Sequence, residues 1–151
     1  MKATLLIGVA TICLPLQAYA QDEFCQALRK IVAIPLKGGN LDALKTSRKS
    51  SVGLYANFNL PGAKDCEIQP AQFGEAYRCS LELSNSKAAG EKARSLDTLI
   101  GSCFADFQRS VKTFPDGIRF DYSKMPIVIN MYHFISPSTE TEVIVRVEIA
   151  K

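Results

Sequence analysis

The sequence predicts an α+β fold, with two helices packed on an antiparallel sheet in the order α-β-β-α-β-β-β. Two observations support this class. Apolar residues recur at helical spacing in two segments, whereas in the strand-like segments they alternate with polar residues. The strand-like segments also follow one another through short breaks instead of alternating with helices, and this order favours antiparallel over parallel pairing.

The first twenty residues have the pattern of a secretory signal peptide. Lys2 precedes an apolar run over residues 5–16, and small residues lead up to Ala20. We expect cleavage after Ala20 and a single exported α+β domain over residues 21–151, in the periplasm or outside the cell. No later stretch reaches the roughly 20 apolar residues of a membrane-spanning helix, so no stable membrane insertion is expected.

The first helix is predicted after Asp22, a possible N-cap, because Phe24, Leu28 and Ile31 recur at helical spacing. Pro35 should end it. The following stretch, residues 36–59, is rich in Gly, Ser and Lys, and its periodicity is too weak to assign an element, with room for a short first strand around residues 54–58.

A hairpin follows, because polar and apolar residues alternate over residues 64–69 and again over residues 77–83. Pro70 and Gly74 predict the turn between the two runs.

The second helix is predicted over residues 86–110. Its buried stripe consists of Ala89, Ala93, Leu96, Leu99, Ile100, Cys103, Phe104 and Phe107. Three alternating runs then predict an antiparallel meander with strands over residues 117–122, 126–135 and 141–150. This order hints at a duplicated unit of one helix followed by strands, although the two halves have no matching sequence.

Two disulfides are expected, because Cys13 leaves with the signal peptide and four cysteines remain in an oxidising compartment. Cys66 falls opposite Cys79 when the hairpin is paired in the register that keeps its apolar residues on one face. Cys25 then pairs with Cys103 and joins the two helices.

The sequence holds little that points to an enzyme. The only histidine, His133, shares the apolar parity of its strand, so we interpret it as a partly buried residue and keep it as a weak catalytic candidate. Ser84 and Lys87 match an S-x-x-K pattern, but the other elements of penicillin-recognising enzymes are missing. The cysteine and histidine spacing predicts no metal site, and no motif indicates a cofactor.

The candidate binding residues lie in and just after a basic segment. It contains Lys45, Arg48 and Lys49 without an acidic residue, and Tyr55 and Phe58 follow. A loop of this kind could contact an acidic surface, although a solvated loop is the simpler interpretation. The formal net charge of +3 gives no reason to expect a nucleic-acid partner.

Three functions remain open. We favour a small exported binding or inhibitory protein with a protein partner in the cell envelope, for example one that blocks an envelope hydrolase or a toxin. One alternative is a small envelope hydrolase that uses His133. The other is a binder of an anionic envelope polymer through the basic loop 45–49.

Overall fold

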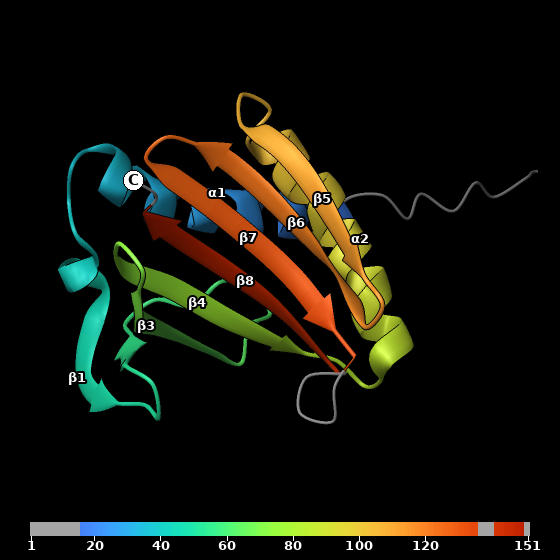
Figure 1. The fold of residues 1–151 in the computed structure, drawn as a ribbon, viewed down its shortest axis with the longest axis horizontal. Helices are drawn as coiled ribbons and strands as arrows, with labels where there is room; N and C mark the ends of the chain where they lie inside the picture. The colour runs from blue at the N-terminus through green and yellow to red at the C-terminus, as the bar shows by residue number, and fades with distance from the viewer. Residues whose placement is uncertain (1–15, 136–140, 150–151) are drawn as a thin grey trace, which may run out of the picture.

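The computed structural model describes residues 16–135 and 141–149, so most of the predicted signal peptide lies outside the described residues. These residues form two α-helices, a short 3₁₀ helix and eight strands (Figure 1). In chain order these are α1 (Leu16–Leu36), η1 (Leu41–Leu44), β1 (Lys45–Lys49), β2 (Leu54–Ala56), β3 (Asp65–Ala71), β4 (Gly74–Glu82), α2 (Ser86–Cys103), β5 (Gln108–Phe114), β6 (Gly117–Lys124), β7 (Ile127–Phe134) and β8 (Glu142–Ile149).

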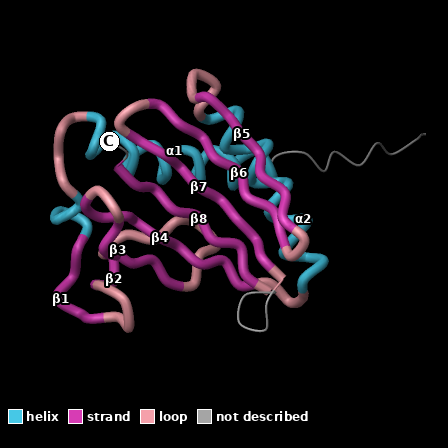
Figure 2. Tube along the Cα trace, in the orientation of Figure 1, coloured by secondary structure: helices cyan, strands magenta, loops and turns pink. Residues whose placement is uncertain are grey.

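All eight strands belong to one antiparallel sheet in the order β1-β2-β3-β4-β8-β7-β6-β5 (Figure 2). The first half of the chain is a helix followed by β1 to β4, and the second half is a helix followed by β5 to β8. The halves meet where β4 pairs with β8 at the centre of the sheet. The order of elements therefore repeats, as the sequence hinted.

The predicted class and the predicted hairpin register are confirmed. Cys66 lies opposite Cys79 and Ile68 lies opposite Tyr77 in the pairing of β3 with β4. The three predicted C-terminal strands correspond to β6, β7 and β8.

The predicted strand order is incomplete, because it has five strands and the structure has eight. The additional strands are β1 and β5, at the two edges of the sheet, and β2, where the sequence left room for a short strand. Residues 45–49 form β1 instead of a loop, and the second helix ends at Cys103 so that residues 108–114 can form β5. Phe104 and Phe107 still reach the core from the turn after the helix, where their ring centroids lie 4.9 Å apart. The apolar spacing of these two residues therefore predicted their burial correctly, but it did not show that they lie in a helix.

The limits of the first helix also differ from those predicted. Helix α1 begins at Leu16, so Asp22 is not its N-cap, and it ends at Leu36, one residue beyond Pro35. The backbone leaves the helix just after this proline, and the N–H groups of Lys37 and Gly39 both bond to the carbonyl of Ile34.

Both helices cover the same face of the sheet and lie behind it in the view of Figure 1. Alternate strand residues point toward them, because successive side chains of a strand lie on opposite faces. The buried core on this side includes Cys66, Ile68, Tyr77, Cys79, Leu81, Phe120, Tyr122, Ile129, Met131, Val143, Val145 and Val147 from the strands, with Leu28, Ile31, Leu96 and Ile100 from the helices.

A row of mostly polar residues crosses the opposite face of the sheet. The strand register places seven residues in one row across it, namely Tyr55, Glu67, Arg78, Arg146, Asn130, Asp121 and Ser110. Asp121 accepts hydrogen bonds from Asn130 at 3.0 Å and from Arg119 at 2.6 Å. Neighbouring side chains therefore pair many of the charges on this face.

Both predicted disulfides are present. The Cys25–Cys103 bond links α1 to α2, and the Cys66–Cys79 bond links β3 to β4. Two such bonds are typical of a protein from an oxidising compartment. Within the described part of the chain, neither helix has the length and apolar character needed to cross a membrane.

Candidate functional site

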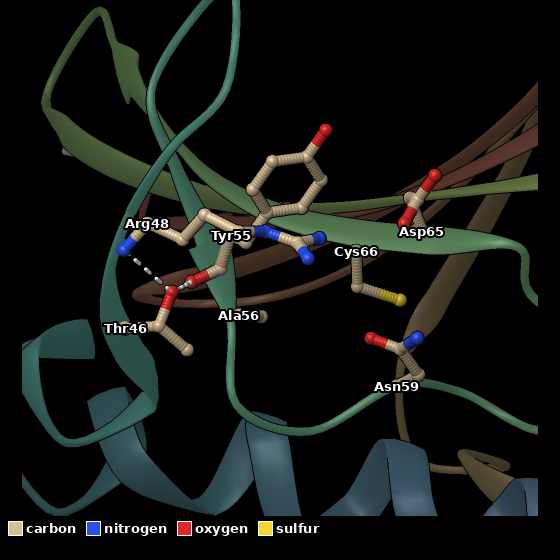
Figure 3. Close-up of a pocket in the computed structure, with 7 residues that line it drawn as sticks. All are labelled: Thr46, Arg48, Tyr55, Ala56, Asn59, Asp65 and Cys66. Atoms are coloured by element: carbon tan, nitrogen blue, oxygen red, sulfur yellow. Dashed lines mark hydrogen bonds between the residues drawn. The ribbon is translucent and has the colours of Figure 1, made fainter.

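A pocket of about 260 Å³ opens near the β1 edge of the sheet (Figure 3). Its walls come from β1, β2, the loop that follows β2, and the start of β3. The lining residues are Thr46, Arg48, Tyr55, Ala56, Asn59, Asp65 and Cys66. We call this the edge pocket.

The irregular pairing of β1 with β2 shapes the edge pocket. Lys45 lies opposite Ala56 and Lys49 lies opposite Leu54. Between these two pairs the chain advances by four residues in β1 but by only two in β2, so β1 bulges. Thr46 bonds to backbone groups where the regular pairing is interrupted. Its hydroxyl donates to the carbonyl of Tyr55 at 2.8 Å and accepts from the Arg48 N–H at 3.2 Å. A bulge of this kind changes the direction of the side chains that follow it.

The re-aimed Arg48 stacks on Tyr55. Its guanidinium carbon lies 3.9 Å from the centroid of the ring, and Figure 3 shows the group extending along the ring toward the side of Asp65 and Asn59. A stacked guanidinium keeps its hydrogen-bond donors available in the plane of the group. The pocket is thus lined by a cation stacked on an aromatic ring, an amide and a carboxylate, which is a set suited to recognition.

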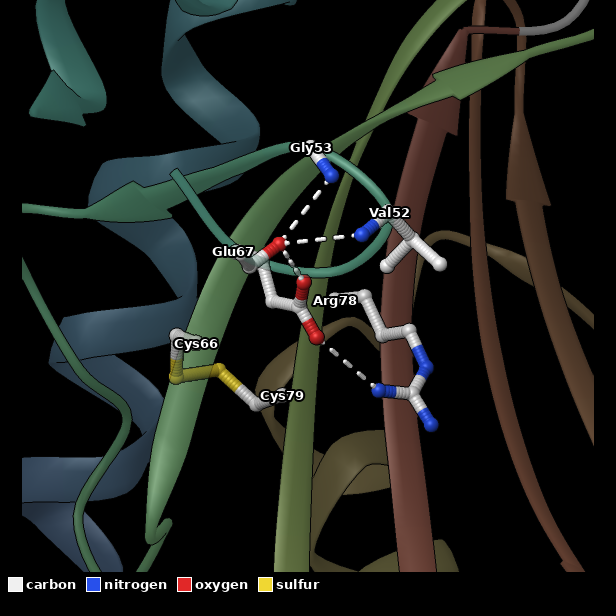
Figure 4. Close-up of polar contacts among 7 residues, drawn as sticks. Val52, Gly53, Cys66, Glu67, Arg78 and Cys79 are labelled. Atoms are coloured by element: carbon white, nitrogen blue, oxygen red, sulfur yellow. Dashed lines mark hydrogen bonds and ion pairs between the residues drawn. A yellow bond between two sulfur atoms is a disulfide. The ribbon is translucent and has the colours of Figure 1, made fainter. Parts of the chain in front are cut away.

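The turn between β1 and β2 is fixed to the sheet beside the edge pocket (Figure 4). The hydroxyl of Ser50 accepts from the N–H groups of Val52 and Gly53 and donates to Glu67. Glu67 also pairs with Arg78 at 3.4 Å. A Cβ atom at Gly53 would lie 2.1 Å from the carbonyl oxygen of Ile68, so only glycine allows this close approach.

The structure brings only two of the five predicted binding residues into the edge pocket, Arg48 and Tyr55. Lys45 instead pairs with Asp42 at 2.5 Å and with Glu75 at 2.6 Å. Phe58 packs against the core, with the Lys30 ammonium 6.0 Å from its ring centroid. Lys49 is exposed at the end of β1.

His133 is 5 % exposed and lies on the helix-covered side of β7. Its Nδ1 lies 2.9 Å from the carbonyl oxygen of Glu142, which can only accept, so this nitrogen carries the proton. The ring thus ties β7 to the start of β8. Its catalytic role stays a prediction, and its surroundings are those of a core residue.

A second polar cluster lies in the other half of the molecule, between α2 and the strands β5 and β6. Asp97 accepts hydrogen bonds from Arg109 at 2.7 and 2.8 Å and from the hydroxyl of Tyr122. Burial opposes the ionisation of Asp97, but these hydrogen bonds outweigh it and hold its pKa below the usual value. Burial, together with the hydrogen bond to Asp97, raises the pKa of Tyr122. The cluster fastens the edge strand β5 to the helix.

No local pattern in the sequence points to the other residues of the edge pocket. Thr46, Asn59 and Asp65 come from three separate segments, and only the folded register brings them to one cavity. Among the residues that the structure describes, no group of histidine, cysteine and acidic side chains could hold a metal ion.

In comparisons with protein-family models, with curated proteins and with solved structures, no match to this chain was found.

Proposed function

We propose that this chain is a small exported binding protein that recognises a protein partner of the cell envelope through the edge pocket. Arg48 pairs with a carboxylate of that partner, and Tyr55 supplies the ring face beside it. The blocking of an envelope hydrolase or the neutralisation of a toxin is the form of this function that we favour.

The observation that carries the proposal is the Arg48–Tyr55 stack, which lies at the mouth of a cavity built by a bulged edge strand. Arginine and tyrosine are enriched among the residues that dominate binding energy at protein interfaces. A guanidinium held on a ring loses little further freedom when it binds a carboxylate, and this favours affinity.

Two features make the alternatives less attractive. Binding of an anionic polymer needs several available cations, and Lys45 is already paired with two acidic residues. Hydrolysis through His133 needs a histidine that substrate can reach, and this ring is 5 % exposed. Both alternatives remain predictions that a direct assay can test.

The test is affinity capture from an envelope extract with the oxidised chain starting at residue 21 as bait. We expect a stoichiometric partner that the Arg48→Gln variant binds at least tenfold more weakly, because a charge pair inside an interface loses one member. The Tyr55→Ala variant should weaken the same complex. Isothermal titration with the purified partner gives the affinities.

Lys49→Gln is the matched control, since it removes a cation of the same strand that does not line the edge pocket. It should keep the affinity within a small factor. Equal weakening by Lys49→Gln and Arg48→Gln would indicate general charge attraction in place of a specific pocket. A partner whose affinity is unchanged by Arg48→Gln would contradict the proposal.

A further inference from the structure

Strand β5 ends the sheet at the side opposite the edge pocket. It pairs with β6 along one side, and all seven of its residues are exposed. Val111 is 42 % exposed and Phe114 is 39 % exposed. The outer side of such a strand presents unpaired backbone N–H and C=O groups that another strand can bond.

The usual protections of an edge strand are weak in β5. Its pairing with β6 is continuous from Gln108 to Phe114, without a bulge, and its sequence QRSVKTF holds no proline. Two of its side chains are cations, but Arg109 is bound to Asp97 and Lys112 lies 3.7 Å from Asp121. The repulsion that normally keeps other strands away from an edge is therefore reduced.

We infer that β5 pairs with β5 of a second copy of this chain, antiparallel and with Val111 on the two-fold axis. This register alone lets all seven residues of both strands pair. It places Val111 opposite Val111 of the second copy, Arg109 opposite Thr113, and Lys112 opposite Ser110. No two like charges face each other, so the strand is complementary to itself in charge as well as in length.

The same register keeps both helix layers on one side of the joined sheet. Val111 lies opposite the buried Phe120 of β6, so its side chain is on the helix-covered face in each copy. Two exposed valines thereby come into contact across the axis. Because β1 lies at the far end of each sheet, both edge pockets stay open at the outer ends of the dimer.

The test is Ser110→Lys, measured by sedimentation equilibrium of the oxidised chain starting at residue 21. Within its own chain, residue 110 lies opposite Asp121, so a lysine is tolerated there. Across the axis, residue 110 of each copy lies opposite Lys112 of the other copy, so the variant creates two pairs of facing lysines. We expect the dimer Kd to rise about tenfold. The wild type should show the mass of two chains at micromolar concentrations.

The compensating variant is Ser110→Lys/Lys112→Glu, in which each lysine faces a glutamate of the second copy and residue 112 still lies opposite Arg119 in its own chain. We expect it to recover the wild-type Kd, while the far-ultraviolet circular dichroism of all three proteins stays the same. A wild-type chain that is monomeric over the concentration range would overturn the inference. A folded Ser110→Lys variant with an unchanged Kd would do so too.

Discussion

The two halves of the molecule share one order of elements but differ in the regularity of their strands. In the first half β1 has five residues and β2 has three, with a bulge between them, whereas β5 to β8 in the second half have seven or eight residues each and continuous pairing. The irregular half forms a pocket at its edge and the regular half presents a straight edge. One architecture therefore carries two edges of different geometry.

The halves also differ in how their parts are fastened. The Cys66–Cys79 bond crosses a hairpin of the first half, where the buried Tyr77 donates to the backbone carbonyl of Phe58. In the second half the hydroxyl of a comparable tyrosine, Tyr122, lies within hydrogen-bond distance of both the carboxylate and the backbone carbonyl of Asp97. The first half thus has a disulfide and a tyrosine that bonds to a neutral carbonyl. In the second half the tyrosine bonds to a residue with a charged carboxylate.

The largest expected effect comes from the disulfide that joins the halves. Its two cysteines are 78 residues apart, and we expect Cys25→Ala/Cys103→Ala to lower the free energy of unfolding by about 4 kcal/mol. The hairpin bond spans 13 residues, and Cys66→Ala/Cys79→Ala should lower it by about 3 kcal/mol. Urea unfolding measures both. A larger loss for Cys66→Ala/Cys79→Ala than for Cys25→Ala/Cys103→Ala would contradict the dependence on loop length.

Substitution of the two buried tyrosines should have a smaller effect on stability and allows a comparison of the two halves. Tyr122→Phe should lower the free energy of unfolding by about 2 kcal/mol, because it removes a hydrogen bond to a charged group. Tyr77→Phe is the matched substitution and should cost about 1 kcal/mol, since its acceptor is a neutral carbonyl. Urea unfolding of both variants measures the difference. Equal values would show that the Asp97 charge adds nothing to the second half.

The smallest effect is a dependence of stability on pH in the acid range. The pKa of Asp97 is lower in the folded protein than in the unfolded chain. The ionised carboxylate therefore contributes fully to the free energy of unfolding above about pH 4, and this contribution is lost as the pH falls through the pKa of the folded state. Asp97→Asn should be less stable than the wild type at neutral pH and should lose less stability on acidification. Urea midpoints between neutral and acid pH measure this, with Asp65→Asn as the control.

The sequence predicted those elements that have a buried face. The hairpin, the meander and both disulfides follow from residues such as Cys66, Tyr77 and Val145, whose burial produces a visible alternation. Strands β1 and β5 lie at the edges, and β5 buries no residue, so their segments lack this alternation. The edge pocket could not be predicted for a related reason, because it depends on a bulge in β1 that no local pattern reports.

The position of β8 has a consequence for the order in which the sheet can be completed. This strand is the last one described, yet it lies between β4 and β7 at the middle of the sheet. The first four strands can pair among themselves without the rest of the chain, but β4 keeps an open side until residues 142–149 have reached it. Such distant pairing slows folding and leaves the waiting strand accessible to chaperones.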